Sequence, residues 1–125
     1  LGRLVCSQNY SAVTAACLLV SREIYQEVGG LDEALAIAFN DVDFCLKIRD
    51  QGYNIVWTPE AKLYHHESVS RGGDDNPENV ERFMAEIEFM QSKWGRKLLN
   101  DPFYNPNLTL VTEDFAIKSG EELRN

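Results

Sequence analysis

The amino-acid sequence predicts an α/β fold with a mixed sheet, helices packed on that sheet and a long amphipathic helix towards the C-terminus. Ala12–Val20 is a nearly continuous apolar run, which is typical of a strand covered on both faces. Asn40–Gly52 combines a capping residue, apolar residues on more than one side and a terminal glycine, which indicates a largely covered helix. From Pro77 to Trp94, apolar residues recur at three- and four-residue steps, which predicts an amphipathic helix about 27 Å long.

Shorter elements connect these three. Ser21 is placed to cap a helix over Arg22–Val28, and Gly29-Gly30 can end it because glycine adopts positive φ. Leu31–Glu33 then forms a turn. After the central helix, the β-rich stretch Tyr53–Thr58 predicts a strand that Pro59 interrupts.

The remaining segments complete one expected domain over residues 1–125, with its core at about 10–108. Ala61–His66 predicts a second short strand, and Ser68–Asn76 is a glycine- and acid-rich loop. Asp101–Leu110 contains two prolines and should be ordered but irregular, packing back on the body. We expect Lys118–Asn125 to be a frayed polar tail.

Composition narrows the function classes. The 125 residues are 44% hydrophobic and 26% charged, as in an ordinary single globular domain, and no stretch has the length of a membrane span. A net charge of −8 argues against nucleic acid or an anionic membrane as a broad electrostatic partner, and leaves open a local basic patch. The sequence begins without Met or a leader, so we expect it to belong to a longer chain. Three cysteines without C-x-x-C spacing indicate reduced thiols in a cytosolic protein.

Two acids at the start of the central helix are the first candidate site. Asn40 is a suitable N-cap, and Asp41 and Asp43 in the first turn complement the helix dipole, which is sufficient structural reason for them. Their side chains should diverge by about 160°, so at most one is a working carboxylate. The same divergence argues against Asp41-Val42-Asp43 as a metal-binding D-x-D, and Asp74-Asp75 is a weaker candidate still.

Two adjacent histidines are the second candidate. On a strand, His65 and His66 would face opposite sides, so one of them could enter a cleft. One histidine is not a metal site, and no Cys/His cluster supplies further ligands, so an ordinary strand end is the structural alternative. The sequence contains neither a G-x-S-x-G elbow nor a glycine-rich phosphate loop.

The order of the motifs carries more information than any one of them. Taken together they resemble the second half of family-two glycosyltransferases of the GT-A fold, over about residues 10 to 108. The motifs are Ala12–Val20, Val28–Glu33, Asn40–Arg49, Gly52-Tyr53, Pro59–Ala61, Tyr64–Ser68, Trp94-Gly95, Asp101-Pro102 and Tyr104–Asn107.

This resemblance implies an inverting enzyme that moves a sugar from a nucleotide-sugar donor to a sugar or glycolipid acceptor, as in polysaccharide biosynthesis. It assigns the general base to Asp41, and a contact with a divalent metal (Mg or Mn) on the diphosphate to His65, with His66 as the alternative. The cleft for acceptor and donor sugar would be lined by Gly30, Asp32, Glu33, Asn40 and Asp43. The place held by Asn40 is often Glu in that family.

The resemblance also implies that a nucleotide-binding N-terminal half precedes this chain, so the isolated chain should be inactive. We expect a cytoplasmic location and no transmembrane segment here, with membrane association through other parts of the complete protein left open. The competing hypothesis is a non-catalytic module for protein contact or acceptor docking, in which Asp41 and His65 are a cap and a strand end. A third possibility, a metal-dependent hydrolase, is poorly supported because the sequence offers too few metal ligands.

Overall fold

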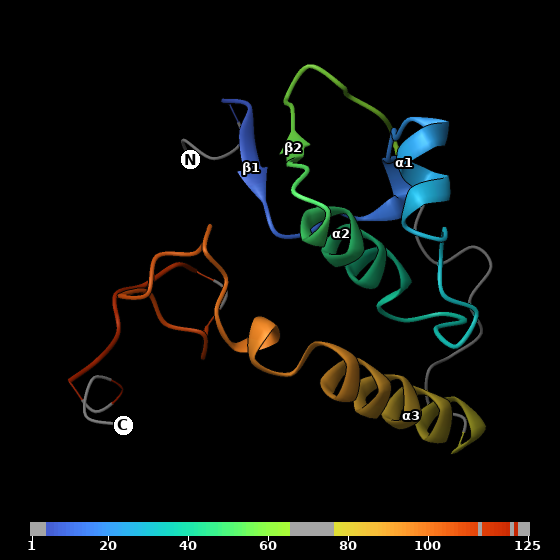
Figure 1. The fold of residues 1–125 in the computed structure, drawn as a ribbon. Helices are drawn as coiled ribbons and strands as arrows, with labels where there is room; N and C mark the ends of the chain where they lie inside the picture. The colour runs from blue at the N-terminus through green and yellow to red at the C-terminus, as the bar shows by residue number, and fades with distance from the viewer. Residues whose placement is uncertain (1–4, 66–76, 113, 121, 123–125) are drawn as a thin grey trace.

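The structure, a computed structural model, describes residues 5–65, 77–112, 114–120 and 122 (Figure 1). It is a mixed α/β arrangement, as expected. In order along the chain, its elements are strand β1 (Gln8–Tyr10), 3-10 turn η2 (Ala15–Cys17), helix α1 (Arg22–Glu27), helix α2 (Asn40–Asp50), strand β2 (Ile55–Trp57), helix α3 (Pro77–Trp94) and 3-10 turn η3 (Gly95–Leu99).

Helix α2 lies at the centre of the fold, with apolar contacts on two sides (Figure 1). Towards α3, Leu46 packs with Leu35, Met90 and Trp94. On another side, Phe44, Cys45 and Ile48 pack with Ile55 of β2, and partly buried residues of the segment 12–28 cover this second cluster. Five of its eleven residues are buried, which confirms the expectation of a covered helix.

The sheet is smaller than predicted. Strands β1 and β2 pair antiparallel in the register Gln8↔Trp57, Asn9↔Val56 and Tyr10↔Ile55, and they form a two-stranded sheet. Strand β2 lies within the predicted strand Tyr53–Thr58, whereas β1 was not predicted. With three residues each, these strands depend on packing against α2 for their stability.

The strand predicted over Ala12–Val20 is wrong. Its middle forms η2, in which the Thr14 hydroxyl accepts a hydrogen bond from the Ala16 N–H at 3.3 Å. The Ala15 N–H, which a strand would use for pairing, instead donates to the Asp41 carboxylate. The flanking apolar side chains contact α2, so the run is apolar because it covers a helix.

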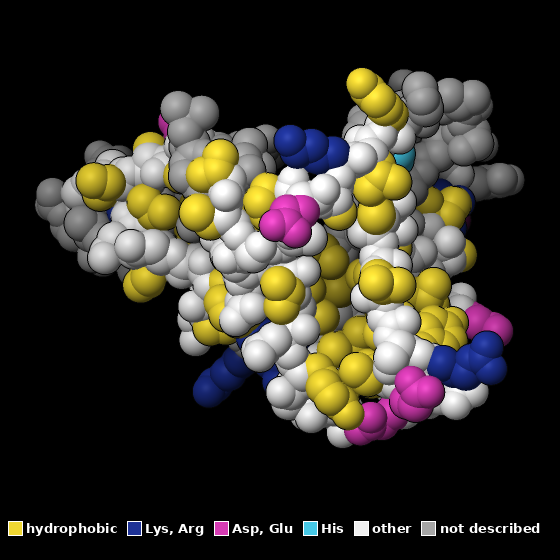
Figure 2. Space-filling view, turned by 90° about the horizontal axis from the view of Figure 1, so that it is seen from above, with side chains coloured by type: hydrophobic (Ala, Val, Ile, Leu, Met, Phe, Trp, Pro, Cys, Tyr) yellow, Lys and Arg dark blue, Asp and Glu magenta, His cyan; other side chains and the backbone are white. Residues whose placement is uncertain are grey.

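The strand predicted over Ala61–His66 is also wrong in its described part. Residues 61–65 have no regular structure and all are exposed, and His66 lies outside the described residues, as do the loop 68–76 and Asp74-Asp75. Chain 58–65 passes from β2 towards α1 (Figure 1). Exposed apolar side chains with scattered charged groups among them mark the face seen from above in Figure 2.

The helix ends follow their local signals. The Ser21 hydroxyl accepts from the Ile24 N–H at 3.3 Å at the start of α1, and Gly29 and Gly30 follow it with φ of 75° and 67°. Gly52 (φ 87°) follows α2 and Gly95 (φ 46°) follows α3, both as predicted. Each glycine occupies the left-handed conformation in which a Cβ would be strained.

The predicted apolar stripe of α3 is covered at one end of the helix. Met90 and Trp94 are buried, whereas Val80, Phe83 and Met84 are 52%, 45% and 51% exposed. Among the described residues, no helix is both long enough and apolar enough to cross a membrane.

The C-terminal segment packs back irregularly, as predicted, through a hydrogen bond of 2.6 Å from the Ser11 hydroxyl to Asp101. The predicted frayed tail, Lys118–Asn125, lies partly outside the described residues, and its described residues make hydrogen bonds. The Lys118 N–H donates to the Asn107 carbonyl at 2.8 Å, and Glu122 accepts from the Ser119 N–H at 2.8 Å and from the Thr109 hydroxyl. These bonds tie the described tail to the loop before it.

Candidate functional site

The start of α2 is held by packing and by a distant carboxylate. The prediction of Asn40 as N-cap is wrong, because the helix begins at Asn40 and the N-cap is Phe39, which has φ 62° and makes no capping hydrogen bond through its side chain. The Phe39 ring stacks on that of Phe83 of α3, with centroids 5.5 Å apart. The two amides before it, those of Ile37 and Ala38, donate to the Glu86 carboxylate at 3.2 and 2.8 Å.

Asp41 is half-buried on the side of α2 that faces η2. Its Oδ2 accepts from the Ala15 N–H at 3.1 Å, and its Oδ1 accepts from the N–H of the next residue, Val42, at 2.9 Å. Each carboxylate oxygen can accept about two hydrogen bonds, so lone pairs remain for a further donor. The geometry therefore suits a group that receives a proton, and equally one that caps a turn.

Asp43 points away from Asp41, as the helical spacing predicts, and is fully buried at 0% exposure. Its Oδ1 accepts from the indole N–H of Trp94 at 2.8 Å and from the ammonium group of Lys93 at 2.8 Å. Its Oδ2 lies 3.3 Å from the ammonium group of Lys47, an ion pair without hydrogen-bond alignment. Asp43 thus joins α2 to the end of α3.

One further predicted residue, Asp32, belongs to the same charged group, which we call the lysine–carboxylate cluster (Asp32, Asp43, Lys47 and Lys93). Lys93 also donates to Asp32 at 2.8 Å, and Lys47 donates to the Gly30 carbonyl at 2.5 Å. The hydrogen bond from Lys93, with a second from the Ala34 N–H, lowers the pKa of Asp32 below its ordinary value. Burial lowers the pKa of Lys93, but its bonds to Asp32 and Asp43 outweigh burial and raise it overall.

The remaining predicted residues do not join this cluster. Glu33 is exposed and Asn40 half-buried at the start of α2, and His65 is exposed on the chain after β2. Within the part of the chain that the structure describes, no group of three His, Cys, Asp or Glu side chains could hold a metal ion. These residues alone therefore do not fit a metal site.

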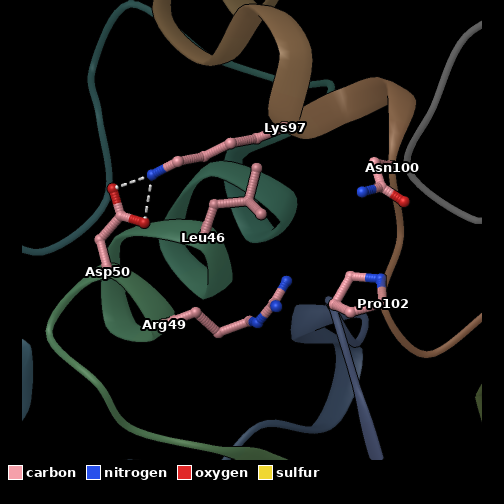
Figure 3. A pocket seen from close by; sticks show the side chains of 6 residues that line it. All are labelled: Leu46, Arg49, Asp50, Lys97, Asn100 and Pro102. Carbon is pink, nitrogen blue, oxygen red and sulfur yellow. Dashed lines mark hydrogen bonds and ion pairs between the residues drawn. The ribbon is translucent and has the colours of Figure 1, made fainter.

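A cavity of about 240 Å³ opens at the opposite end of α2 from Asp41 (Figure 3). The Lys97 ammonium group crosses its rim to both Asp50 oxygens at 2.5 and 2.6 Å, and the Arg49 guanidinium lies 5.1 Å from the Phe103 ring centroid. The sequence predicted no functional role for this region. Its lining comprises Leu46, Arg49, Asp50, Lys97, Asn100 and Pro102.

The supporting side chains of α3 and that of Lys47 were not predicted from the sequence. Glu86 is 3% exposed and sits within the apolar stripe of α3, three residues after Phe83 and four before Met90. An acid inside an apolar helical stripe is a signal that could have identified it, because a carboxylate is rarely buried without hydrogen-bond donors. Lys93 and Trp94 gave no such signal, since a lysine in the last turn complements the helix dipole and Trp94 continues the apolar stripe of α3.

This chain is similar in sequence to segments of much longer proteins. This chain is 56% identical over 118 residues to the uncharacterized protein y4gI of Sinorhizobium fredii, and 35% identical over 122 residues to the O-antigen biosynthesis protein RfbC of Myxococcus xanthus. Each match covers 94% of this chain, but only 13% and 9% of those two relatives.

A shorter match covers half of this chain. Over 62 residues, this chain is 36% identical to the N-acetylglucosaminyl-diphospho-decaprenol L-rhamnosyltransferase of Mycobacterium tuberculosis. The matched segment is 20% of that protein. No family model matches the chain, and no solved structure matches it.

Proposed function

We propose that this chain is part of a glycosyltransferase that moves a sugar from a nucleotide-sugar donor to a hydroxyl group of a sugar or glycolipid acceptor, in polysaccharide biosynthesis. The observation that carries the proposal is the similarity to a protein named for O-antigen biosynthesis over 94% of the chain, supported by the shorter match to a named rhamnosyltransferase. The motif order adds the finer assignment to the acceptor-side, C-terminal half of a family-two GT-A domain.

In the proposed reaction, Asp41 is the general base. The acceptor oxygen attacks the anomeric carbon while the bond from that carbon to the diphosphate oxygen breaks, and the electron pair leaves with the diphosphate. The hydroxyl proton passes to Asp41, and attack opposite the leaving group inverts the anomeric configuration. The Ala15 and Val42 amides orient the carboxylate and leave lone pairs for that proton.

The proposed cleft for acceptor and donor sugar lies along the turn after α1 and the start of α2. Gly30, Asp32, Glu33 and Asn40 remain proposed contacts of the acceptor or donor sugar. Asp43 is buried at 0% exposure, so in this proposal it supports the cleft from behind.

A divalent metal, Mg or Mn, belongs to the proposal for the complete protein. His65, with His66 as the alternative, would be the ligand that this chain offers, and the nucleotide-binding N-terminal half would supply the others. None of the steps of the proposed reaction depends on this metal. We also retain the cytoplasmic location, with any membrane association made by other parts of the protein.

The decisive experiment is Asp41→Asn in the complete protein. We expect transfer to be abolished while the donor still binds, because asparagine keeps the shape but cannot take up the proton. Asp50→Asn, the same substitution at an exposed site on the same helix, is the matched control. Near-normal turnover by Asp41→Asn would refute the assignment of the base.

The isolated chain tests the missing half. It should transfer no measurable sugar, because it carries only part of the donor site, and measurable transfer would refute this division.

The alternative function is a non-catalytic docking module. The observation in its favour is that both Asp41 oxygens accept from backbone amides, as a purely structural cap would. A complete protein that binds an acceptor glycan but transfers no sugar from any donor would support it.

A further inference from the structure

We propose that Glu86 is a positioning residue for Asp41, a role that rests on the proposed function of Asp41 as the base. Glu86 lies 45 positions away in the sequence, and it acts through the loop that leads into α2. Its carboxylate is 3% exposed, and both of its oxygens accept from the backbone of that loop.

The match between donor and acceptor groups is specific. The N–H groups of Ile37 and Ala38 are consecutive, and each donates to a different oxygen of Glu86, at 3.2 and 2.8 Å. Among the side chains, a carboxylate presents two adjacent acceptors and no donor. Glutamine of the same shape would present one acceptor and one NH₂ group to the same two amides, so one of the bonds would be lost.

The loop needs this external support because its own conformation is unfavourable. Phe39 adopts the left-handed conformation (φ 62°), which is rarely populated by a bulky residue. The helix then begins directly, with its first turn closed by the Asp43 N–H donating to the Phe39 carbonyl at 2.8 Å. Any relaxation of the loop would therefore be transmitted into the turn that carries Asp41.

Asp41 lies between two attachments of the same helix. Before it, Ala38 is bound to Glu86, and after it, Asp43 is bound to Lys93 and Trp94. On α3 these attachments are about two turns apart, roughly 10–12 Å. Helix α3 thus fixes both the entry and the inner face of the turn, and so the direction in which Asp41 points.

The test uses the complete protein with Glu86→Gln, Glu86→Ala and the control Glu88→Gln. Glu88 is exposed on the same helix, so its substitution makes the same charge change without touching the loop. The donor is whichever of a panel of UDP-, GDP- and dTDP-linked sugars the wild-type protein transfers. We expect kcat to fall about 10-fold in Glu86→Gln and about 100-fold in Glu86→Ala, with KM for the donor within about twofold, since small misplacements of a catalytic group cost this much.

Amide hydrogen exchange gives a readout that does not depend on activity. In Glu86→Gln, peptides spanning residues 36–43 should exchange about 10-fold faster or more, while the rest of α3 and the Glu88→Gln protein keep wild-type exchange. Unchanged exchange over 36–43 would overturn the proposal, as would a Glu86→Gln protein with wild-type kcat. A Glu86→Gln protein that loses protection throughout α3 would also overturn it, because Glu86 would then serve overall stability.

Failure of the inference and failure of the proposed function give different results. If Asp41→Asn is inactive and Glu86→Gln is fully active, the positioning role is wrong and the base assignment stands. If Asp41→Asn transfers sugar normally, the base assignment fails and the inference fails with it, whatever the hydrogen exchange shows.

Discussion

Replacing Asp43 with asparagine removes the negative charge that lies between Lys47 and Lys93. The carboxylate is fully buried, with the two ammonium groups 3.3 and 2.8 Å away and the Trp94 indole N–H also at 2.8 Å. Asparagine can still accept the indole hydrogen bond through its carbonyl oxygen. Its NH₂ group, however, would face Lys47, which would lose this countercharge, and Lys93 would keep only that of Asp32.

The expected loss of stability can be bounded from these contacts. Removing one partner of a buried ion pair costs about 3–5 kcal/mol when the other charge is left unpaired. Here Lys93 keeps Asp32, Lys47 keeps the Gly30 carbonyl, and the lysine side chains are 29% and 17% exposed, so water screens them in part. We therefore expect Asp43→Asn to lower the free energy of unfolding by about 2–3 kcal/mol.

The assay is urea unfolding followed by circular dichroism at 222 nm, with Asp50→Asn as the control. Asp50 lies on the same helix and pairs with Lys97, but that pair is 43% and 54% exposed and should contribute about 0–1 kcal/mol. An unchanged m-value would show that the midpoint shift reports stability. The reasoning is refuted if the two variants lose the same free energy within about 0.5 kcal/mol, because burial would then have made no difference.

Three further predictions follow from the same structure. Gly30→Ala should destabilise the protein by about 1 kcal/mol more than Gly29→Ala. Both glycines have positive φ, but a Cβ at Gly30 would lie 2.8 Å from the Tyr25 ring, whereas a Cβ at Gly29 would have no atom within 4 Å. Equal losses of stability in urea unfolding would contradict this packing. Burial raises the pKa of the Cys45 thiol, so DTNB should label the two exposed cysteines, Cys6 and Cys17, at once and Cys45 only after unfolding. Rapid labelling of three thiols per chain would contradict the burial of Cys45 in α2. The pKa of Asp32 is lowered by folding, so its stabilisation is present above its ordinary value of 3.8 and is lost as the pH falls through the lowered pKa. The stability difference between wild type and Asp32→Asn should therefore shrink as the pH falls below 3.8, and a constant difference would contradict this.

Local chemistry made the helices predictable. Ser21 caps α1, Gly52 follows α2 and Gly95 follows α3, as inferred from residues within one turn of each helix end. These signals need no tertiary information, because they satisfy or terminate the helix's own backbone groups. The central, covered position of α2 was predictable as well, since apolar residues lie on more than one of its sides.

Non-local contacts decided what could not be predicted. The run Ala12–Val20 has the composition of a strand, but the Ala15 amide bonds to a carboxylate 26 positions further along, and the apolar side chains around it cover α2. Asn40 is a better cap than Phe39 by propensity, yet Phe39 is fixed by stacking on a helix more than 40 residues later. Competition between a local preference and a distant partner cannot be settled from the local preference alone.

In the candidate site, too, local geometry was predictable and the distant partners were not, as Asp41 and Asp43 show. Helical geometry predicted that Asp41 and Asp43 diverge, and it could not tell which of them faces inward. The lysine–carboxylate cluster determines this, because Lys93 and Trp94 arrive from α3 to bind Asp43. Once Asp43 is held inside, the helical rotation of about 160° turns Asp41 to the opposite side, towards the amide of Ala15. The buried carboxylate therefore determines where the half-buried one can act, and a base at Asp41 requires the anchor at Asp43.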